Sequence, residues 1–291
     1  MNLLGKYING NYNVSIFDDG TKIRETNEDV FISSFPECID IKITNQCDMG
    51  CPYCHENSTP TGLHGELLDN QFINTLQPYT ELAIGGGNPL IHPQLVQFLE
   101  ILKSKNIIAN MTVNQKHFMQ DIIFIDYLIS NNLIKGLGVS FTHYDDSFVN
   151  FIQNYPNAVL HVINGVVNYS DLEKMYGKDL KILILGYKNI RRGIDYYSQQ
   201  VEDKKKVIYD NICEIVKGFK VVSFDNLAID QLKLKRIFTD KDWNEFYMGD
   251  DGQYTMYIDL VNREFAKSST TKERFPLTDN IINMFSVVKT L

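Results

Sequence analysis

The sequence lacks any long uninterrupted run of apolar residues, and it has no excess of positive charge. No stretch of the 291 residues approaches the roughly 20 apolar residues that a membrane-spanning helix needs. The first 20 residues mix polar and apolar side chains, so we expect no signal peptide. The net charge of −8 argues against a broad surface for nucleic-acid phosphates. We therefore expect a cytoplasmic protein that binds neither membrane nor duplex nucleic acid.

Cysteine is scarce, and repeats, low-complexity tracts and long linkers are absent. Five cysteines make an odd number, so a disulfide framework is not expected, and free thiols fit a reducing compartment. Hydrophobic residues make up 44% of the chain and aromatic residues 12%, which is enough to bury one large core. The composition therefore predicts one main domain with small additions.

Three of the five cysteines lie within eight residues, in the pattern C-x3-C-x2-C formed by Cys47, Cys51 and Cys54. They directly follow the strand-like run 39–44. Clustering of this kind in a cysteine-poor chain indicates a metal site, and thiolates select zinc or iron-sulfur clusters. The loop is therefore the first candidate for the chemistry of this protein.

A four-iron cluster normally takes four cysteine ligands, and this loop supplies three. Mostly extended chain separates Cys38 from Cys47, which at about 3.3 Å per residue puts them up to ~30 Å apart. Cys213 lies in a helical pattern far downstream. Three protein ligands leave one metal position open, which is typical of a catalytic site.

From residue 39 onward, short apolar runs alternate with helical patterns, which is typical of βαβ units and a parallel sheet. Strands are predicted at 39–45, 81–84, 107–113, 138–142, 158–163, 181–186 and 219–224. Helices are predicted after a cap at Asp69, around 95–102, at 120–130 and around 208–216. Antiparallel hairpins are predicted at 12–24, around an Asp-Gly turn, and at 254–266. The fold class is therefore α/β.

The cysteine motif, with Tyr53 directly before the last cysteine, resembles that of the radical S-adenosylmethionine (SAM) enzymes. The resemblance covers roughly residues 39–225 and implies a partial (β/α)6 barrel. It implies that Cys47, Cys51 and Cys54 hold a [4Fe-4S] cluster whose fourth iron chelates SAM. It also implies reductive cleavage of SAM to a 5′-deoxyadenosyl radical, which takes a hydrogen atom from the substrate. A flavodoxin or ferredoxin is the implied electron donor.

With this resemblance the chain divides into an N-terminal β-hairpin arm at 1–38, the partial barrel at 39–226 and a C-terminal helix and β-hairpin extension at 227–291. The arm is expected to pack as a cap on the bottom or edge of the barrel. Its alternative role is to contact the substrate. Together, arm and extension are expected to shape the substrate cavity.

Ligands of parallel barrels lie at the C-terminal ends of the strands. The run Gly85-Gly86-Gly87-Asn88 follows the second strand and resembles the family's Gly-Gly-Glu-Pro segment, whose backbone receives the amino group of SAM. Asn88 replaces the acidic residue, and a flexible turn is the alternative interpretation. The predicted SAM-binding residues are Tyr53, Gly85, Gly86, Gly87, Asn88, Asn114, Ser140, Thr142, Ile163 and Leu185. For the polar members of this set the alternative is a hydrogen bond to backbone, and for the apolar and aromatic members it is ordinary packing.

Basic residues gather after the sixth strand at Lys188, Arg191 and Arg192. We predict Lys188, Arg191 and Asp225 as catalytic or substrate-binding groups. The cations would clamp a carboxylate or phosphate, or else form a solvated turn. Asp225 would accept a proton or hydrogen bond from substrate, or else cap the next helix. His55 and Glu56 are interpreted as exposed loop polarity.

The substrate is the least constrained part of the prediction. Only Cys38 and Cys213 remain outside the motif, too few for a second four-cysteine cluster. A single-cluster enzyme acting on a small polar or anionic molecule, or on a peptide, is therefore favoured. The alternatives are a glycyl-radical activase acting on a partner protein, and a non-catalytic zinc or iron-sulfur regulator. A large partner predicts an open active-site face, and a small substrate predicts closure by the C-terminal extension.

Overall fold

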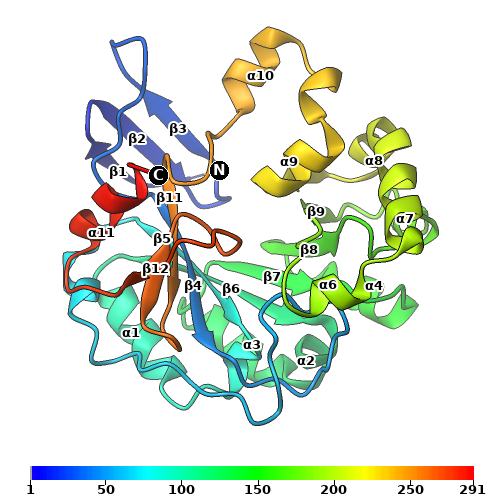
Figure 1. Ribbon diagram of the computed structural model, residues 1–291, viewed down its shortest axis with the longest axis horizontal. Helices are drawn as coiled ribbons and strands as arrows, with labels where there is room; N and C mark the ends of the chain where they lie inside the picture. Colours follow the sequence, from blue (N-terminus) through cyan, green and yellow to red (C-terminus); the bar gives the residue numbers. More distant parts are fainter. Residues whose placement is uncertain (1) are drawn as a thin grey trace.

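A computed structural model describes residues 2–291, and within that range the strands form two sheets (Figure 1). The smaller sheet is antiparallel and consists of β1 (Leu3–Asn9), β2 (Tyr12–Phe17) and β3 (Lys22–Glu25). The larger sheet consists of β4 (Cys38–Thr44), β5 (Glu81–Gly86), β6 (Ile108–Asn114), β7 (Gly136–Ser140), β8 (Ala158–Ile163), β9 (Lys181–Leu185), β10 (Val221–Phe224), β11 (Thr255–Asp259), β12 (Glu264–Ala266) and β13 (Phe275–Pro276).

Helices connect these strands along residues 2–291. The α-helices are α1 (Leu95–Ser104), α2 (Gln115–Gln120), α3 (Ile122–Ser130), α4 (Asp146–Ile152), α5 (Tyr169–Glu173), α6 (Arg192–Tyr196), α7 (Gln199–Asp210), α8 (Ile212–Gly218), α9 (Asn226–Leu232), α10 (Asp240–Phe246) and α11 (Ile281–Val288). Short 3₁₀ helices cover Gln71–Thr75, Pro89–Ile91 and Leu234–Ile237. None of the helices in residues 2–291 combines the length and apolar character that crossing a bilayer requires.

The large sheet has the strand order β10-β9-β8-β7-β6-β5-β4-β11-β12-β13. Every neighbouring pair from β10 to β11 is parallel, and β12 and β13 continue the sheet in antiparallel pairs. Because β10 and β13 lie at its two edges, the sheet is open and forms a partial barrel. The predicted α/β class and the seven predicted strands from 39 to 224 are confirmed. The predicted C-terminal hairpin is also present, as β11 and β12, and the structure adds that β11 lies parallel to β4.

Apolar and polar side chains alternate along β4, so that one face of the strand packs under the helices and the other face points into the barrel. Ile39, Ile41 and Ile43 are at most 1% exposed and belong to the main hydrophobic core, which lies between the sheet and its helices. Successive strand residues point to opposite faces, so Asp40 and Lys42 face the interior of the barrel, the lumen. The sequence therefore places apolar side chains under the helices and polar ones in the lumen.

Two predicted helices differ from the structure, and one further helix was not predicted. The segment after Asp69 forms only a short 3₁₀ helix, and its N-terminal residue Asn70 makes no capping hydrogen bond. The helix predicted at 120–130 is confirmed as α3, and the structure adds the short α2 directly before it. The helix predicted around 208–216 is interrupted at Asn211. Apolar periodicity continues across this break because both helices pack on the same core, so the pattern alone did not reveal it.

Ion pairs and hydrogen bonds to buried carboxylates hold the small N-terminal sheet to the barrel. The buried Glu37, directly before β4, accepts hydrogen bonds from Tyr12 at 2.6 Å and Arg24 at 2.9 Å, while Lys22 pairs with Glu81 of β5 at 2.5 Å. The β2–β3 turn at Asp18–Thr21 lies across the lumen at the N-terminal ends of the strands. The small sheet thus lies at the bottom of the barrel, and its strand β1 was not predicted.

Candidate functional site

The cysteine loop begins where β4 ends and is closed on itself by backbone hydrogen bonds. The N–H of Cys47 donates to the Thr59 carbonyl at 2.9 Å, and the N–H of Cys54 donates to the Cys51 carbonyl at 3.2 Å. All three cysteines are free and half-buried. We call residues 47–58 the cluster loop. Its three thiols therefore leave the first barrel strand together, at the edge where ligands of parallel sheets bind.

The other two cysteines lie far from this loop in the fold. Cys38 starts β4, at the end of the strand opposite to the cluster loop, and burial raises the pKa of its thiol. Cys213 is exposed on α8. The pKa values of Cys47 and Cys51 are also raised by burial, an effect that the nearby Arg192 opposes. The loop thus offers three thiols as candidate ligands for a soft metal.

One further set of ligand atoms lies at the outer side of the loop. Ligand atoms of Cys47, Asp48 and His117 all lie within 4.8 Å of one another. The His117 ring is buried, and its Nε2 lies 2.6 Å from an Asp48 oxygen, while its Nδ1 has no hydrogen-bond partner among the described residues. Sequence reasoning missed the pair of Asp48 and His117 because 69 residues separate them in the chain.

The glycine run after β5 lies directly against the start of the cluster loop. The N–H groups of Gly87 and Asn88 donate to the Thr44 and Gln46 carbonyls at 2.7 Å each. A Cβ on Gly87 would come within 2.3 Å of the Gln46 oxygen, and Gly86 has φ of +113°. These two glycines are therefore required by backbone packing.

Gly85 has a different environment. A Cβ built there meets no atom within 4 Å, so this is the glycine that leaves room for a ligand. The Asn88 side chain, at the position of the family's acidic residue, is buried and caps the Pro89–Ile91 helix by accepting a hydrogen bond from Leu90. Asn88 thus serves local structure, and the open space is at Gly85.

Several predicted SAM-binding residues lie side by side at the C-terminal ends of the strands. In the sheet register Asn114 is opposite Ser140, and Ile163 is opposite Leu185. Asn114 also caps α2 by accepting from the Lys116 N–H. The sheet therefore brings this set to one edge, and their contact with SAM stays a prediction.

Thr142 and Tyr53 lie in protein contacts at the same end. Thr142 donates its backbone and side-chain hydrogens to the buried Gln115 Oε1, at 2.8 and 3.0 Å, which joins the β6 and β7 exits. The ring of Tyr53 packs edge-on against Tyr196 at 5.5 Å, and burial raises the pKa of its hydroxyl. Gln115 was not predicted, because nothing in its local sequence distinguishes it from a surface glutamine.

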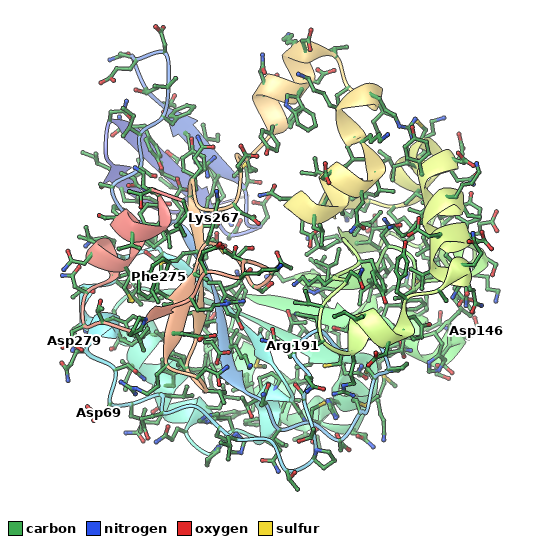
Figure 2. All side chains as sticks on the ribbon, in the orientation of Figure 1. Asp69, Asp146, Arg191, Lys267, Phe275 and Asp279 are labelled. Atoms are coloured by element: carbon green, nitrogen blue, oxygen red, sulfur yellow. The ribbon has the colours of Figure 1, made fainter. Side chains whose placement is uncertain are left out.

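The basic residues after β9 point at the cluster loop. Arg191 donates to the His55 carbonyl at 2.7 Å, and Arg192 donates to the Cys51 carbonyl at 3.0 Å. Lys188 contacts His55 Nε2 at 3.3 Å and donates to Ser269 Oγ at 2.8 Å. Figure 2 shows Arg191 near the middle of the molecule, between β4 and α6. The turn is thus bound to protein rather than solvated.

Glu56 is the buried centre of these contacts, so its interpretation as exposed loop polarity was wrong. Its carboxylate pairs with Lys42 at 3.1 Å, with Arg191 at 3.2 Å and with His55 at 3.3 Å. Burial by itself raises the pKa of Glu56, but the bonds with His55 and Lys42 outweigh it and hold the pKa well below its usual range. Glu56 therefore ties the cluster loop to the barrel as an anion.

Lys42 extends this network to the C-terminal segment of the chain. It is 2% exposed and lies 3.0 Å from Asp259, which is fully buried on β11. Sequence reasoning missed the pair, although one signal was present, since Lys42 stands alone as a cation in the apolar strand 39–44. Its burial between two carboxylates connects the first barrel strand, the cluster loop and the strand added by the extension.

Asp225 adopts the capping role that was its alternative. Its Oδ1 accepts hydrogen bonds from the Ala228 N–H at 2.7 Å, which caps α9, and from the Gly186 N–H at 2.8 Å. Burial raises its pKa, against the effect of these bonds. Asp40 faces the lumen nearby, and burial raises its pKa to about 6, with Lys188 acting in the opposite direction. A catalytic role for Asp225 stays a prediction.

The lumen opens into a cavity of about 950 Å³ that reaches from its middle to the N-terminal mouth. Thr112, His161 and Ser223 line it, and in residues 2–291 none of their side chains forms a hydrogen bond with protein. A Cβ on Gly138 would come within 2.5 Å of the His161 ring, so glycine is needed for the ring to lie there. Burial lowers the pKa of His161 to about 4. Uncharged polar groups and apolar surface therefore line the middle of the cavity, while charged residues such as Asp18, Glu81 and Lys181 lie at its N-terminal mouth.

A family model, described as the radical SAM superfamily, matches residues 41–187. That range is half of the chain, and it contains the cluster loop, the glycine run and the strands from β5 to β9. The chain belongs to the radical SAM superfamily. This radical SAM protein is therefore an enzyme, and its cofactors are a [4Fe-4S] cluster and SAM.

Solved structures share the fold at low sequence identity. The protein is similar to Streptococcus suis SuiB bound to the precursor peptide SuiA, with 12% identity and a TM-score of 0.61 over 89% of this chain and 68% of that one. It is similar to SuiB bound to SAM, with 13% identity and a TM-score of 0.58 over 88% and 66%. This radical SAM enzyme thus spans about two thirds of the SuiB chain. No curated protein matches it.

The residues present fit these cofactors. The donor set is three unpaired, half-buried thiols, the number that leaves one iron of a four-iron cluster without a cysteine. Open space at Gly85 lies beside the strand from which the loop departs, since β4 and β5 are hydrogen-bonded neighbours. Loop, glycine and lumen therefore meet at one edge of the sheet.

Proposed function

We propose that Cys47, Cys51 and Cys54 hold the [4Fe-4S] cluster and that SAM binds between it and Gly85. When bound, these cofactors supply a 5′-deoxyadenosyl radical, which takes a hydrogen atom from a substrate in the lumen. The observation that carries the proposal is the set of three half-buried free thiols at the exit of β4, beside the open face of Gly85. An electron donor such as flavodoxin or ferredoxin, and a reducing compartment such as the cytoplasm, are part of the proposal.

The chain's own groups act by positioning and by excluding water. Glu56, Arg191 and Lys42 hold the cluster loop on the barrel. Ser140 and Asn114, at the strand exits, are proposed to hydrogen-bond the polar parts of SAM. Lys188 and Asp225 are proposed to face the substrate where the lumen meets the cofactors, with Asp40 near them.

The proposed substrate is a flexible peptide segment or a small polar molecule rather than a folded protein. The C-terminal segment crosses the gap between β10 and β11, since Asn226 donates to Asp251 at 2.8 Å and Lys188 donates to Ser269 at 2.8 Å. These contacts narrow the opening to the proposed active site. A glycyl-radical activase would need a wide opening there to admit a folded partner protein. A peptide is favoured because the similar SuiB is described as bound to a precursor peptide.

The decisive experiment is anaerobic reconstitution with iron and sulfide, followed by paramagnetic resonance of the reduced protein with and without SAM. We expect about four irons per chain and a signal that changes when SAM is added. Zinc without sulfide would overturn the proposal and favour a regulator, for which Cys47, Asp48 and His117 offer a ready set of ligand atoms.

The substrate class has its own test. Release of 5′-deoxyadenosine from SAM is measured with a low-molecular-mass cell extract, before and after the extract is digested with a protease that is then removed. Stimulation that disappears on digestion indicates a peptide, and stimulation that persists indicates a small molecule.

A further inference from the structure

The turn between β9 and α6 holds the cluster loop through a set of cations that we call the cationic clamp, Lys188, Arg191 and Arg192. Arg192 reaches furthest along the loop. Its Nη1 donates to the Cys51 carbonyl at 3.0 Å, its Nε donates to Asn57 Oδ1 at 3.1 Å, and its Nη2 donates to the Ser58 carbonyl. One planar guanidinium therefore spans the loop from a predicted cluster ligand to the end of the loop.

The backbone of the turn is strained in a way that supports this placement. Arg191 has φ of 51° and ψ of −128°, a region that residues with a Cβ rarely adopt. A Cβ on Gly193 would lie 2.2 Å from the Lys188 carbonyl oxygen, so the turn is as tight as glycine permits. Such a strained backbone conformation persists where the surrounding contacts fix it. Here the strained turn directs two consecutive arginines at one loop.

The two arginines differ in the groups that face them. Arg191 pairs with the carboxylate of Glu56 at 3.2 Å. Arg192 meets only neutral carbonyl and amide oxygens, and within residues 2–291 no carboxylate lies at ion-pair distance from it. A half-buried cation without an anion is costly. The anionic groups available to Arg192 are the cysteine thiolates of the loop it holds.

We propose that Arg192 is a positioning residue that fixes the Cys51 segment of the cluster loop and offsets the negative charge of the thiolate-bound cluster. The inference rests on the proposed function. Reduction adds an electron to the cluster, so a nearby fixed positive charge stabilises the reduced form and raises the reduction potential. Arg192 therefore sets how readily the electron donor reduces the cluster.

The test is a redox titration of the reconstituted protein, followed by paramagnetic resonance, with two variants that lower the net positive charge beside the loop by different routes. Arg192→Gln removes the guanidinium. Asn57→Asp keeps the acceptor for Arg192 but places a carboxylate against it, at an exposed residue with φ of 54°, where aspartate is tolerated. Both are expected to change the ratio of oxidised to reduced cluster about tenfold at a fixed potential, a midpoint shift of ~59 mV to more negative values.

Two further variants separate charge from hydrogen bonding. Arg192→Lys keeps the charge and loses the planar fork, so its midpoint is expected to stay near that of the wild type while iron is lost to a chelator faster. Arg236→Gln is the matched control, because Arg236 stacks on Tyr209 and donates to its carbonyl at 2.7 Å, away from the loop. It is expected to change neither the midpoint nor the rate of iron loss.

The outcomes distinguish this inference from the proposed function. A wild-type protein that binds no cluster overturns both. A wild-type cluster whose midpoint is unchanged by Asn57→Asp overturns the role of Arg192 alone, and the Asn57 variant settles the question even if Arg192→Gln fails to fold. A negative shift in Asn57→Asp, with Arg192→Lys near the wild type, supports the role.

Discussion

Around the cluster loop the buried charged side chains are bonded to protein, whereas three polar side chains that line the cavity, Thr112, His161 and Ser223, form no hydrogen bond within residues 2–291. Glu56 of the cluster loop is paired with Lys42, Arg191 and His55. Thr112 and His161, in the middle of the lumen, form no side-chain hydrogen bond within residues 2–291.

The difference indicates what each region has to do. Buried charges that are fully paired fix a geometry, and a loop that carries a metal cluster needs a fixed geometry. Unpartnered polar groups beside a cavity can exchange water for a ligand at little cost. We therefore expect substitutions at the cluster end to act on cofactor and stability, and those in the lumen to act mainly on local packing and on the substrate.

The largest effect is expected at the cysteines. Cys51→Ala should reduce bound iron to background, and because loss of an outer-shell partner alone costs about 10–100-fold, SAM cleavage should fall by more than about 100-fold. Iron content and 5′-deoxyadenosine release measure it. Cys213→Ala, at an exposed site on α8, is the control and should match the wild type. Equal loss in both variants would contradict the assignment of the ligands.

Lys42 tests whether the paired charges are required. Lys42→Met keeps the length of the side chain but leaves Asp259 buried without its cation. We expect the free energy of unfolding to fall by about 3 kcal/mol, measured by denaturant titration. The control is Lys206→Met, which removes an exposed pair with Asp210 and should change it by less than about 0.5 kcal/mol. Similar values for the two would mean that the buried network is not needed for stability.

Gly138 tests the packing of the lumen. Gly138→Ala puts a methyl group 2.5 Å from the His161 ring and 2.7 Å from Thr112 Oγ1, so the ring must move. We expect a loss of about 1–3 kcal/mol in unfolding free energy. Gly85→Ala is the comparison, since its methyl group meets no protein atom, and it should leave the stability of the cofactor-free protein unchanged but weaken SAM binding. If both variants bind SAM as tightly as the wild type, Gly85 does not line the SAM site.

The last effect appears only at acidic pH: it is the pH dependence that His161 confers on stability. Burial lowers its pKa to about 4, from about 6.5 in an unfolded chain. The folded state therefore resists protonation, and stability that is complete above pH 6.5 is lost as the pH falls through 4. The wild type should lose about 3 kcal/mol more than His161→Gln between pH 7 and pH 4, measured by urea unfolding. If the unfolding free energies of the two proteins depend on pH in the same way, then His161 is solvated and its pKa is not lowered.

Much of the barrel was readable from the sequence. Strands 81–84 and 158–163 were predicted because each is a short apolar run between helical patterns, and their place in a parallel sheet follows from that alternation. The neighbouring helices were less predictable, since the break at Asn211 does not interrupt the apolar periodicity and the short α2 was not predicted. β11 was predicted as half of a hairpin, but its pairing with β4 depends on where the chain returns after more than 200 residues.

The candidate site divides in the same way. The cysteines were found because their spacing is local, and the glycine run because it follows a strand. Glu56 and Lys42 were missed, since an isolated charge in a sequence does not reveal which charge will meet it. Arg191 and Arg192 were noticed as basic residues at a strand exit, but their binding partner, the cluster loop, was not predicted.

The sequence by itself determined the three-thiol motif, the order of strands and helices, and the polar side chains at the strand exits, because each depends on residues within one turn or one strand of each other. Only the tertiary structure decided which charges pair. Lys42 and Asp259 are 217 residues apart, and Arg192 and Cys51 are 141 apart. Contacts over such separations follow from sheet register and from the strained turn at Arg191, since these fix where a side chain ends in space.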